Sequence, residues 1–245
     1  MLTKGLDVLQ HFAARPHGDT ASGVARELGL PLSTAHRLVS TLAKRGWLTR
    51  TDMTYRMGLQ ALGAAGAVFE GRRLTDLHGA IADLSARLRE TVILGTLTGE
   101  EFVYVDVVHG PGLLGVKGSV SQRGPLHCTA VGKGVLTALP RERREELMGR
   151  LEMPRFTKRT ITDVESLRRE IDRGVERGYT LADEEYEVGV VSIGTPLRLI
   201  NDPDGAYAMC VSVPAQRANP ERRAEFKAAL EDTVATMQTA GVVAR

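Results

Sequence analysis

The sequence Ser-Thr-Ala-His-Arg-Leu-Val-Ser-Thr-Leu-Ala-Lys occupies residues 33–44. Its apolar members recur at the spacing of a helix with one buried face: Ala35, Leu38, Val39 and Leu42. Ser33 stands where it can cap the first turn of that helix. The opposite face combines hydroxyl, imidazole and cationic groups that can bind base edges and phosphates: Thr34, His36, Arg37, Ser40, Thr41 and Lys44. We therefore expect a helix that fits the major groove of DNA.

The segment before this helix predicts two more helices. Thr3 can cap the first, and Pro16-His17-Gly18-Asp19 ends it. Thr20 opens a second, short helix, and Gly29 can reverse the chain in the left-handed conformation. Leu30-Pro31-Leu32 then supplies the turn into the polar helix. A short helix, a glycine turn and a polar helix are typical of a helix-turn-helix.

Two short strands are expected after the polar helix. Trp47–Arg50 and Thr54–Met57 flank Thr51-Asp52-Met53, so they predict the hairpin called a wing. From this wing, Arg50 and Arg56 would lie along the phosphate backbone of DNA. The first part of the chain is thus expected to be a winged helix-turn-helix.

The surplus of basic residues lies in this first part. Residues 1–70 hold 8 Lys/Arg against 5 Asp/Glu, whereas residues 71–245 hold 24 against 25. No acidic residue occurs between Glu27 and Asp52, so no carboxylate of the polar helix repels phosphate. We expect DNA contacts from Ser33, Thr34, His36, Arg37, Thr41, Lys44, Arg50 and Arg56. The periodicity alone is also compatible with a small packed domain that never touches DNA.

The overall composition is that of a folded globular protein, with 42% hydrophobic and 25% charged residues in a chain of 245. No apolar run approaches the ~20 residues that cross a bilayer, and no signal-peptide core follows Met1. We therefore expect a cytoplasmic protein with no membrane partner. Cys128 and Cys210 stand outside any CxxC spacing, which supports neither a disulfide framework nor a zinc site. We expect no metal and no cofactor.

The hydrophobic pattern divides the chain into three parts. Residues 1–58 form the DNA-binding domain, residues 59–74 a linker helix rich in Ala and Gly, and residues 75–245 a second domain. The small residues of the linker helix would allow a helix from a second subunit to pack closely. A strong amphipathic helix from Leu74 to Leu88 begins the second domain.

An α+β fold is expected for the second domain, with an antiparallel sheet covered by helices. The strands are predicted at Val92–Leu97, Phe102–Val108, Leu113–Lys117, Tyr179–Ala182, Val190–Leu199 and Ala206–Val213. A turn at Asn201–Gly205 would join the last two. The helices are predicted at Thr129–Leu139, Arg141–Leu151, Asp163–Arg177 and from Pro220 onward, with Asn219 as the cap of the last.

The loop at residues 123–134 leads into a helix, and the free backbone N–H groups of such a junction bind carboxylates well. Gly132-Lys133 does not complete a phosphate loop, because His127 stands where that motif needs glycine. Cys128 beside His127 raises the question of a nucleophile, but adjacent residues at a helix start point apart and no third orienting group can be named. We therefore expect no catalytic residue.

Two further groups are candidates for a site. Asp183-Glu184-Glu185 could supply acids or metal ligands, although three successive carboxylates are also typical of a solvated turn. Cys210 and Ser212 share one face of a strand, where two small polar groups suit a pocket wall but are also compatible with a core. The residues alone leave both alternatives open.

Several motifs in the same order resemble the IclR family of bacterial transcriptional regulators, and they span essentially the whole chain. In the first part they are Lys4–Leu9, Pro31–Leu38 through Arg45–Trp47, and Tyr55–Gly58. In the second part they are Pro125–Lys133, Asp183–Glu185 with Gly189, and Cys210–Pro214. Each motif is short, so the specificity lies in their order.

The resemblance implies a homodimer, often paired into a tetramer, that represses or activates nearby genes from double-stranded DNA operators. It also implies a GAF-like second domain that binds a small metabolite, such as an organic acid or an aromatic catabolite. Carried over by position, the effector pocket would be walled by Leu126, His127, Thr129, Ala130, Val190, Ser192, Cys210 and Ser212. The chain departs from the usual pattern at Ser192, where many members have Cys, and at Ala182, where an Asp often stands.

The mechanism expected from these parts couples the binding of an effector to the binding of DNA. An effector would reorder the loop at residues 126–130 and shift the linker helix, which would change the separation of two wings on a palindromic operator. Two other functions are considered: an enzyme that uses the second domain, and a ligand-binding or scaffolding module that never touches DNA.

Overall fold

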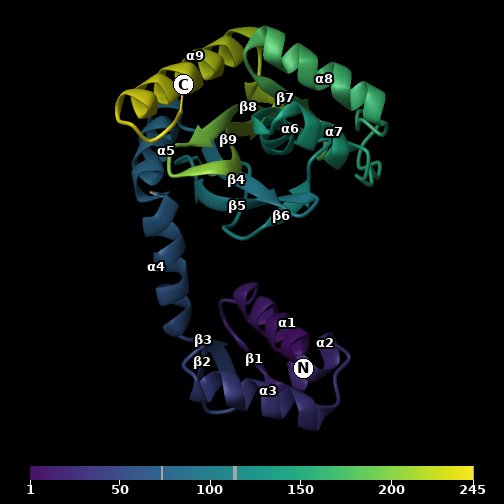
Figure 1. The fold of residues 1–245 in the computed structure, drawn as a ribbon, viewed down its shortest axis with the longest axis vertical. Coiled ribbons are helices and arrows are strands. Elements are labelled where there is room, and N and C mark those ends of the chain that lie inside the picture. The colour runs from purple at the N-terminus through teal and green to yellow at the C-terminus, as the bar shows by residue number, and fades with distance from the viewer. Residues whose placement is uncertain (73, 113–114, 245) are drawn as a thin grey trace. The chain divides into compact units, whose positions relative to one another are not determined.

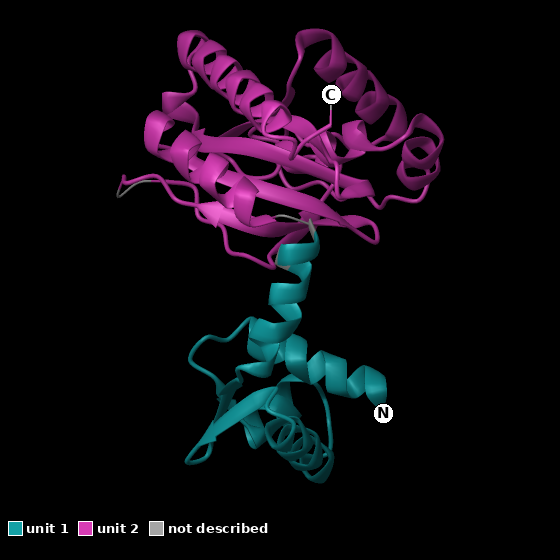
Figure 2. Cartoon of the chain, turned by 60° about the vertical axis from the view of Figure 1, so that its left-hand side comes forward, with its two compact units in different colours: residues 1–71 teal, residues 72–245 magenta. Residues whose placement is uncertain are grey.

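The computed structural model describes residues 1–72, 74–112 and 115–244. The chain divides into two compact units, residues 1–71 and residues 72–245 (Figure 2). The division falls near the end of the expected linker helix, so most of that helix belongs to the first unit. Among the described residues, no helix is long and apolar enough to span a membrane.

The first unit contains the predicted winged helix-turn-helix (Figure 1). Its elements are α1 (Leu2–Ala13), β1 (Asp19–Thr20), α2 (Ala21–Glu27), α3 (Leu32–Lys44), β2 (Leu48–Thr51), β3 (Thr54–Met57) and α4 (Gln60–Arg72). The strands form a small antiparallel sheet in the order β1-β3-β2. Val8 and Phe12 of α1, Val24 of α2, and Ala35 and Val39 of α3 share one hydrophobic core.

The helix boundaries of this unit follow local chemistry at some positions and correct the prediction at others. Thr20 caps α2, because its Oγ1 accepts a hydrogen bond from the Gly23 N–H at 3.0 Å, and Gly29 has the expected left-handed φ of +61°. The prediction that Ser33 caps α3 is wrong. The backbone carbonyl of Pro31 already accepts hydrogen bonds from the third and fourth residues after it, so α3 begins at Leu32. Thr3 likewise lies inside α1, which begins at Leu2.

The second unit has the expected α+β fold. Its helices are α5 (Leu74–Leu88), α6 (Ala130–Ala138), α7 (Arg141–Met148), α8 (Val164–Arg177), η1 (Ala215–Arg217) and α9 (Pro220–Thr239). Its strands are β4 (Thr91–Thr98), β5 (Glu101–Val108), β6 (Arg123–Pro125), β7 (Thr180–Asp183), β8 (Val190–Leu199) and β9 (Asp202–Pro214). They form one sheet in the order β6-β5-β4-β9-β8-β7, and all neighbouring strands are antiparallel.

Two connections differ from the prediction. The strand expected at 113–117 begins at residues 113 and 114, outside the described residues, and residues 115–117 are in no strand. The neighbouring glycines disfavour a strand there, and β6 instead pairs with β5. The expected turn at Asn201–Gly205 is shorter than predicted, because Leu199 and Asp202 pair directly and leave two residues between β8 and β9.

The sheet buries both of its faces. Ile93, Ala208 and Cys210 belong to the core that α6 covers, and α6 contacts strands β4, β5, β7, β8 and β9. Because side chains alternate along a strand, Val211 and Ile193 point to the other face. Helices α5 and α9 pack together and contact β4, β8 and β9. This arrangement places the N-terminal end of α6 over the middle of the sheet.

Candidate functional site

The outer face of α3 is open to solvent in the first unit. Ala35 and Val39 have no exposed surface, so one side of the helix is fixed to the core. On the other side, Ser33, His36, Arg37, Thr41 and Lys44 are exposed and Thr34 is half-buried. The Thr41 hydroxyl donates to the Arg37 carbonyl at 2.8 Å, which leaves its oxygen free to accept from outside. The six side chains thus form one polar, basic surface.

The two arginines of the wing are exposed, but each is held by a neighbouring carbonyl. Arg50 Nε donates to the Asp52 carbonyl at 2.7 Å, and Arg56 Nε donates to the His17 carbonyl at 3.1 Å. Each guanidinium has five N–H donors, so both keep donors for a further acceptor. The wing turns at Asp52, which has a left-handed φ of +54°.

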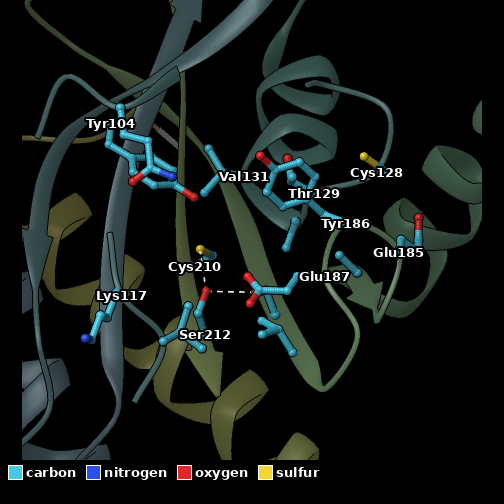
Figure 3. A pocket seen from close by; sticks show the side chains of 16 residues that line it. Tyr104, Lys117, Cys128, Thr129, Val131, Glu185, Tyr186, Glu187, Cys210 and Ser212 are labelled. Carbon is cyan, nitrogen blue, oxygen red and sulfur yellow. Dashed lines mark hydrogen bonds between the residues drawn. The ribbon is translucent and has the colours of Figure 1, made fainter. Parts of the chain in front are cut away.

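The second unit contains a small cavity of about 60 Å³ between the sheet and the start of α6 (Figure 3). Of the eight residues expected to wall an effector pocket, the cavity is lined by Thr129, Ala130, Val190, Ser192, Cys210 and Ser212. Its other lining residues are Tyr104, Val116, Lys117, Gln122, Cys128, Val131, Ala182, Glu185, Tyr186 and Glu187. Segments far apart in the sequence therefore meet around one space.

The remaining two expected residues do not line this cavity. Leu126 is buried in the hydrophobic core beside α6. The imidazole of His127 is also buried, and its Nε2 lies 3.1 Å from the Pro154 carbonyl. Burial lowers the pKa of His127 below its usual value, so the neutral ring donates Nε2–H to that carbonyl. Neither side chain faces the cavity: Leu126 packs in the core, and His127 contacts the segment that contains Pro154.

Hydroxyl groups gather on the sheet side of the cavity. Ser192 of β8 and Ser212 of β9 are cross-strand partners, with their Oγ atoms 2.8 Å apart, and Cys210 Sγ lies 3.6 Å from Ser212 Oγ. At the helix side, Thr129 caps α6 by accepting from the Gly132 N–H at 3.0 Å. Burial raises the pKa of the Tyr104 phenol far above its usual value, so it stays a neutral hydroxyl.

The cavity has no reactive thiolate. Burial raises the pKa of both cysteine thiols, Cys128 and Cys210, to about 12. The His127 ring is engaged with Pro154 and is not positioned as a base for the neighbouring thiol. Among the described residues, no group of three His, Cys, Asp or Glu side chains is arranged to hold a metal ion. The geometry is that of a binding cavity with hydrogen-bonding walls.

Comparison with known proteins explains why the helix-turn-helix and the unit that contains the cavity occur in one chain. The family model described as the bacterial transcriptional regulator IclR C-terminal matches residues 74–239, and the IclR helix-turn-helix domain matches residues 1–52. The chain belongs to the IclR family. The predicted resemblance is thereby confirmed, as is the α+β fold with an N-terminal helix-turn-helix.

Individual relatives of the IclR family cover nearly the whole chain. HTH-type transcriptional regulator Rv1719 of Mycobacterium tuberculosis is 32% identical over 232 residues, which cover 94% of this chain and 88% of that protein. Transcriptional repressor IclR of Escherichia coli is 26% identical over 244 residues, which cover 96% and 89%. A crystal structure of an IclR homolog from Microbacterium hydrocarbonoxydans, complexed with 4-hydroxybenzoate, matches with a TM-score of 0.76 at 25% identity and covers 96% of this chain and 99% of that one.

These relatives are regulators of transcription, so this IclR-family chain is a DNA-binding transcriptional regulator and not an enzyme. Both departures from the usual family pattern, Ser192 and Ala182, lie in the cavity wall. At Ala182 the side chain is a methyl group, so β7 contributes no carboxylate to this wall.

Several residues that line the cavity were not predicted from the sequence, among them Tyr104, Lys117, Gln122 and Tyr186. Tyr104 lies in a predicted strand, but which face of that strand meets the cavity depends on pairing with β4. Lys117 is the last residue of the strand predicted at 113–117, and Gln122 lies after it in a segment for which no element is predicted. The acidic run at Asp183–Glu185, beside Tyr186, gave a signal, but such a run more often forms a solvated turn than a site.

Proposed function

We propose that this regulator binds a palindromic operator as a dimer or tetramer, and that a small organic acid in its cavity changes its affinity for DNA. The observation that carries the proposal is the exposed polar, basic face of α3, whose opposite face is fixed in a core. A helix presented in this way fits the major groove of B-DNA, which is about 12 Å wide.

The DNA contacts are divided by chemistry. We assign base contacts to Thr34 and Arg37, because they lie in the first turns of α3, and phosphate contacts to Arg50 and Arg56 of the wing. The full proposed set is Ser33, Thr34, His36, Arg37, Thr41, Lys44, Arg50 and Arg56. All of these except Thr34 are exposed.

Apolar side chains on the first unit support a dimer. Leu59, just before α4, and Leu62, in its first turn, are 80% and 68% exposed, and Leu2 and Leu6 of α1 are 79% and 51% exposed. Gly63 and Gly66 of α4 have open space where a side chain would stand, which allows another helix to approach closely. Exposed apolar groups of this kind favour burial against a second copy.

Two features of the cavity, a helix terminus and hydroxyl groups, support an anionic effector. The wall also contains an exposed lysine, Lys117, and an exposed glutamate, Glu187, so the charged side chains alone do not select the sign of a ligand. The N-terminal end of α6, with Ala130 and Val131 in the wall, favours negative charge. Ser192 and Ser212 offer hydroxyls. The solved homolog with 4-hydroxybenzoate is consistent with a carboxylate, and a cavity of about 60 Å³ favours smaller acids than that ligand unless the walls move.

The test measures how an acid changes the affinity of the full chain for DNA. Fluorescence anisotropy with the DNA upstream of the chain's own gene is measured against random competitor DNA, with and without acetate, pyruvate, succinate or 4-hydroxybenzoate. We expect one acid to raise the melting temperature and to change operator affinity, because linkage requires effector and DNA to alter each other's affinity by the same factor. An acid that binds tightly but leaves operator affinity unchanged contradicts the coupling. No preference for any duplex over competitor contradicts the DNA role.

A further inference from the structure

The loop that joins β7 to β8 forms one border of the cavity. Within this loop, residues 184–189, which we call the strap, Glu185, Tyr186 and Glu187 all line the cavity. Tyr186 and Glu187 are also exposed to solvent, so the strap separates the cavity from the outside. The strap begins with Glu184 in a left-handed conformation, with φ of +56°, and ends at Gly189 with φ of +84°.

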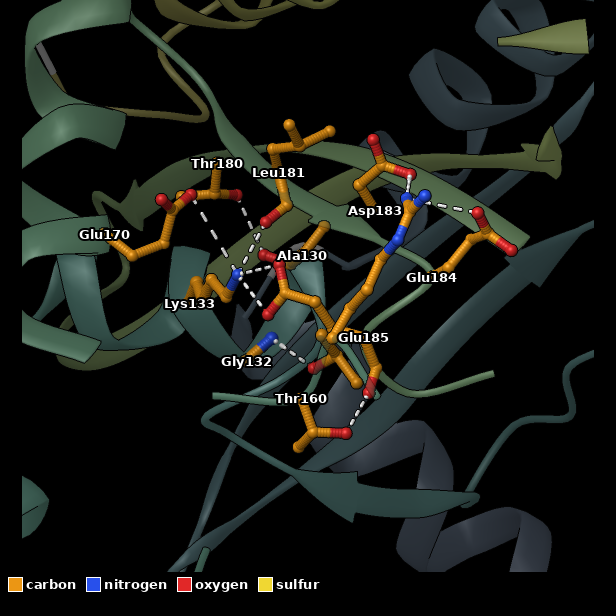
Figure 4. Close-up of polar contacts among 12 residues, drawn as sticks. Ala130, Gly132, Lys133, Thr160, Glu170, Thr180, Leu181, Asp183, Glu184 and Glu185 are labelled. Carbon is orange, nitrogen blue, oxygen red and sulfur yellow. Dashed lines mark hydrogen bonds and ion pairs between the residues drawn. The ribbon is translucent and has the colours of Figure 1, made fainter. Parts of the chain in front are cut away.

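The strap is attached to α6 by a buried ion pair (Figure 4). Lys133 is 1% exposed, and its Nζ donates to Glu185 Oε1 at 2.6 Å, to Glu185 Oε2 at 2.7 Å and to the Leu181 carbonyl at 2.7 Å. Glu170 of α8 lies 4.0 Å from the same ammonium. Burial raises the pKa of the Glu185 carboxyl and the Lys133 ammonium opposes this, so the carboxylate depends on its partner.

An ion pair with an exposed arginine, a backbone bond and neutral side-chain hydrogen bonds complete the attachment. Arg159 Nη1 lies 3.1 Å from Glu184 Oε1, and the Ala215 N–H donates to the Gly189 carbonyl at 2.8 Å. Because Arg159 is exposed, its ion pair contributes little. Thr160 Oγ1 donates to the Glu185 carbonyl at 2.6 Å, and Thr157 Oγ1 donates to the Glu184 carbonyl at 2.7 Å. Such bonds are individually weaker than a buried charge-assisted one. The strap is therefore held mainly by the ion pair between Lys133 and Glu185.

The opposite border of the cavity is fixed differently. Residues 116–122 are bonded through backbone groups to the sheet: the Tyr104 N–H donates to the Gln122 carbonyl and the Ser121 N–H donates to the Tyr104 carbonyl, each at 2.8 Å. The Thr91 hydroxyl also donates to the Val116 carbonyl at 2.9 Å. This border is bonded to strand β5 through backbone groups, whereas the backbone bonds of the strap lie at Glu184, Glu187 and Gly189. The middle of the strap, at Glu185 and Tyr186, is therefore held by side chains.

We propose that Lys133 and Glu185 are positioning residues that hold the strap across the cavity, and that opening of the strap is the route by which a ligand reaches the cavity. Removing the Lys133 charge leaves the Glu185 carboxylate buried without its partner, and removing the Glu185 charge leaves the Lys133 ammonium with only Glu170, 4.0 Å away. Either change favours a state in which the strap moves out and water enters. The proposal concerns the same cavity as the proposed effector site. Its test needs no effector, so the two proposals can fail separately.

The test uses the two cysteines of the chain as internal probes. Cys128 and Cys210 both line the cavity and are buried, and the sequence contains no other cysteine. Methyl methanethiosulfonate, a small uncharged thiol reagent, is added to the full chain without denaturant, and labelling is followed by mass spectrometry. We expect Glu185→Gln and Lys133→Met to label at least tenfold faster than the parent. Lys133→Arg, which keeps the charge, should label at close to the parental rate.

A matched control separates strap opening from general destabilisation. Glu90 is another buried carboxylate of the same unit, 3% exposed, and it accepts hydrogen bonds from Arg217 at 2.8 and 2.7 Å. Glu90→Gln should leave labelling in native buffer unchanged. In the strap variants, labelling should depend only weakly on urea, because local opening exposes little surface.

Three outcomes would overturn the proposal: parental labelling rates in both charge-removing variants, equal acceleration in Glu90→Gln, or a urea dependence as steep as that of global unfolding. If Glu185→Gln does not fold, Glu185→Asp provides the same test. It keeps the charge but shortens the side chain, so it should accelerate labelling by a smaller factor than removal of the Lys133 charge. No acceleration in a folded Glu185→Asp protein would also count against the strap.

Discussion

Arg50 and Arg56 leave the wing on opposite faces. The register pairs Arg50 with Tyr55 and Thr49 with Arg56, and cross-strand partners share a face. Arg50 therefore lies on the side of buried Tyr55, with its Cζ 5.7 Å from the ring centroid. Arg56 lies on the other side, where its stem passes Gly18, a glycine with φ of +82° that has no room for a Cβ. A wing with one cation on each face can contact phosphates of both DNA strands.

This relationship predicts the effect of removing each wing charge. Arg50→Ala and Arg56→Ala should each weaken binding to all DNA sequences alike and lower the slope of log affinity against log salt by about one, because each loses one phosphate contact. Anisotropy titrations at several salt concentrations measure the slope. Arg26→Ala removes an exposed charge outside the proposed contacts and serves as the control. An unchanged slope in both wing variants would refute the phosphate assignment.

A base contact behaves differently from a phosphate contact. Arg37→Ala should weaken operator binding by about 1–3 kcal/mol while binding to random DNA falls much less, so that sequence preference relaxes. Lys44→Ala, at the far end of α3, should instead weaken both. The ratio of operator to competitor affinity at one fixed salt concentration measures the difference. Equal losses on operator and random DNA in Arg37→Ala would place this side chain on the backbone.

The exposed apolar start of α4 predicts a subunit interface. Leu62→Glu should shift the protein from dimer toward monomer, because a carboxylate buried between two helices lacks a partner. Sedimentation equilibrium at micromolar concentration measures the shift. Val175→Glu places the same charge on an exposed apolar position of α8, 60% exposed, and should leave the assembly unchanged. A purely monomeric parent protein would rule out the interface at once.

The close contact between α6 and the loop before it predicts a sensitive glycine. A Cβ on Gly132 would stand 2.5 Å from the Leu126 Cα and carbonyl oxygen, which are backbone atoms that cannot move aside. Gly132→Ala should therefore destabilise the second unit by about 1–3 kcal/mol in urea unfolding. Gly79→Ala, in α5 of the same unit, meets nothing within 4 Å and should be neutral or stabilising. Equal stability of both variants would mean that the loop adapts freely.

The raised cysteine pKa values predict a loss of stability in alkali. An ordinary thiol ionises near a pKa of about 8.5, whereas Cys128 and Cys210 in the fold ionise only at about 12. The folded state therefore holds these protons more tightly than the unfolded state, and its stability falls as pH rises above about 8.5. Urea unfolding at about pH 8 and about pH 10 should differ by about 1 kcal/mol or more per thiol. The double variant Cys128→Ser/Cys210→Ser should lose this part of the slope.

The first unit could be predicted from its sequence because its signals are local. Hydrophobic residues three and four apart define the buried face of α3, Thr20 caps α2 with its own hydroxyl, and Gly29 takes up the left-handed turn. The error at Ser33 also has a local cause. A competing local group, the Pro31 carbonyl, starts the helix two residues earlier.

The cavity could be predicted only in part. The loop at residues 123–134 is a candidate because it leads into a helix, and the shared face of Cys210 and Ser212 follows from strand alternation. Thr129 and Ala130 are assigned to the wall only through the resemblance to the family. His127 could not be placed in this way. Whether its ring faces the cavity or the Pro154 carbonyl depends on a loop 27 residues further along the chain.

The sequence by itself determined which segments become helices and strands, which face of α3 carries hydrogen-bonding groups, and which family the chain belongs to. Those properties depend on side-chain periodicity and on neighbours within a few residues. Only the tertiary structure decided that Lys133 meets Glu185 across 52 residues and that strands β5, β8 and β9 surround one cavity. Pairing between distant segments depends on strand register and on how well whole surfaces pack, and a linear pattern does not record either.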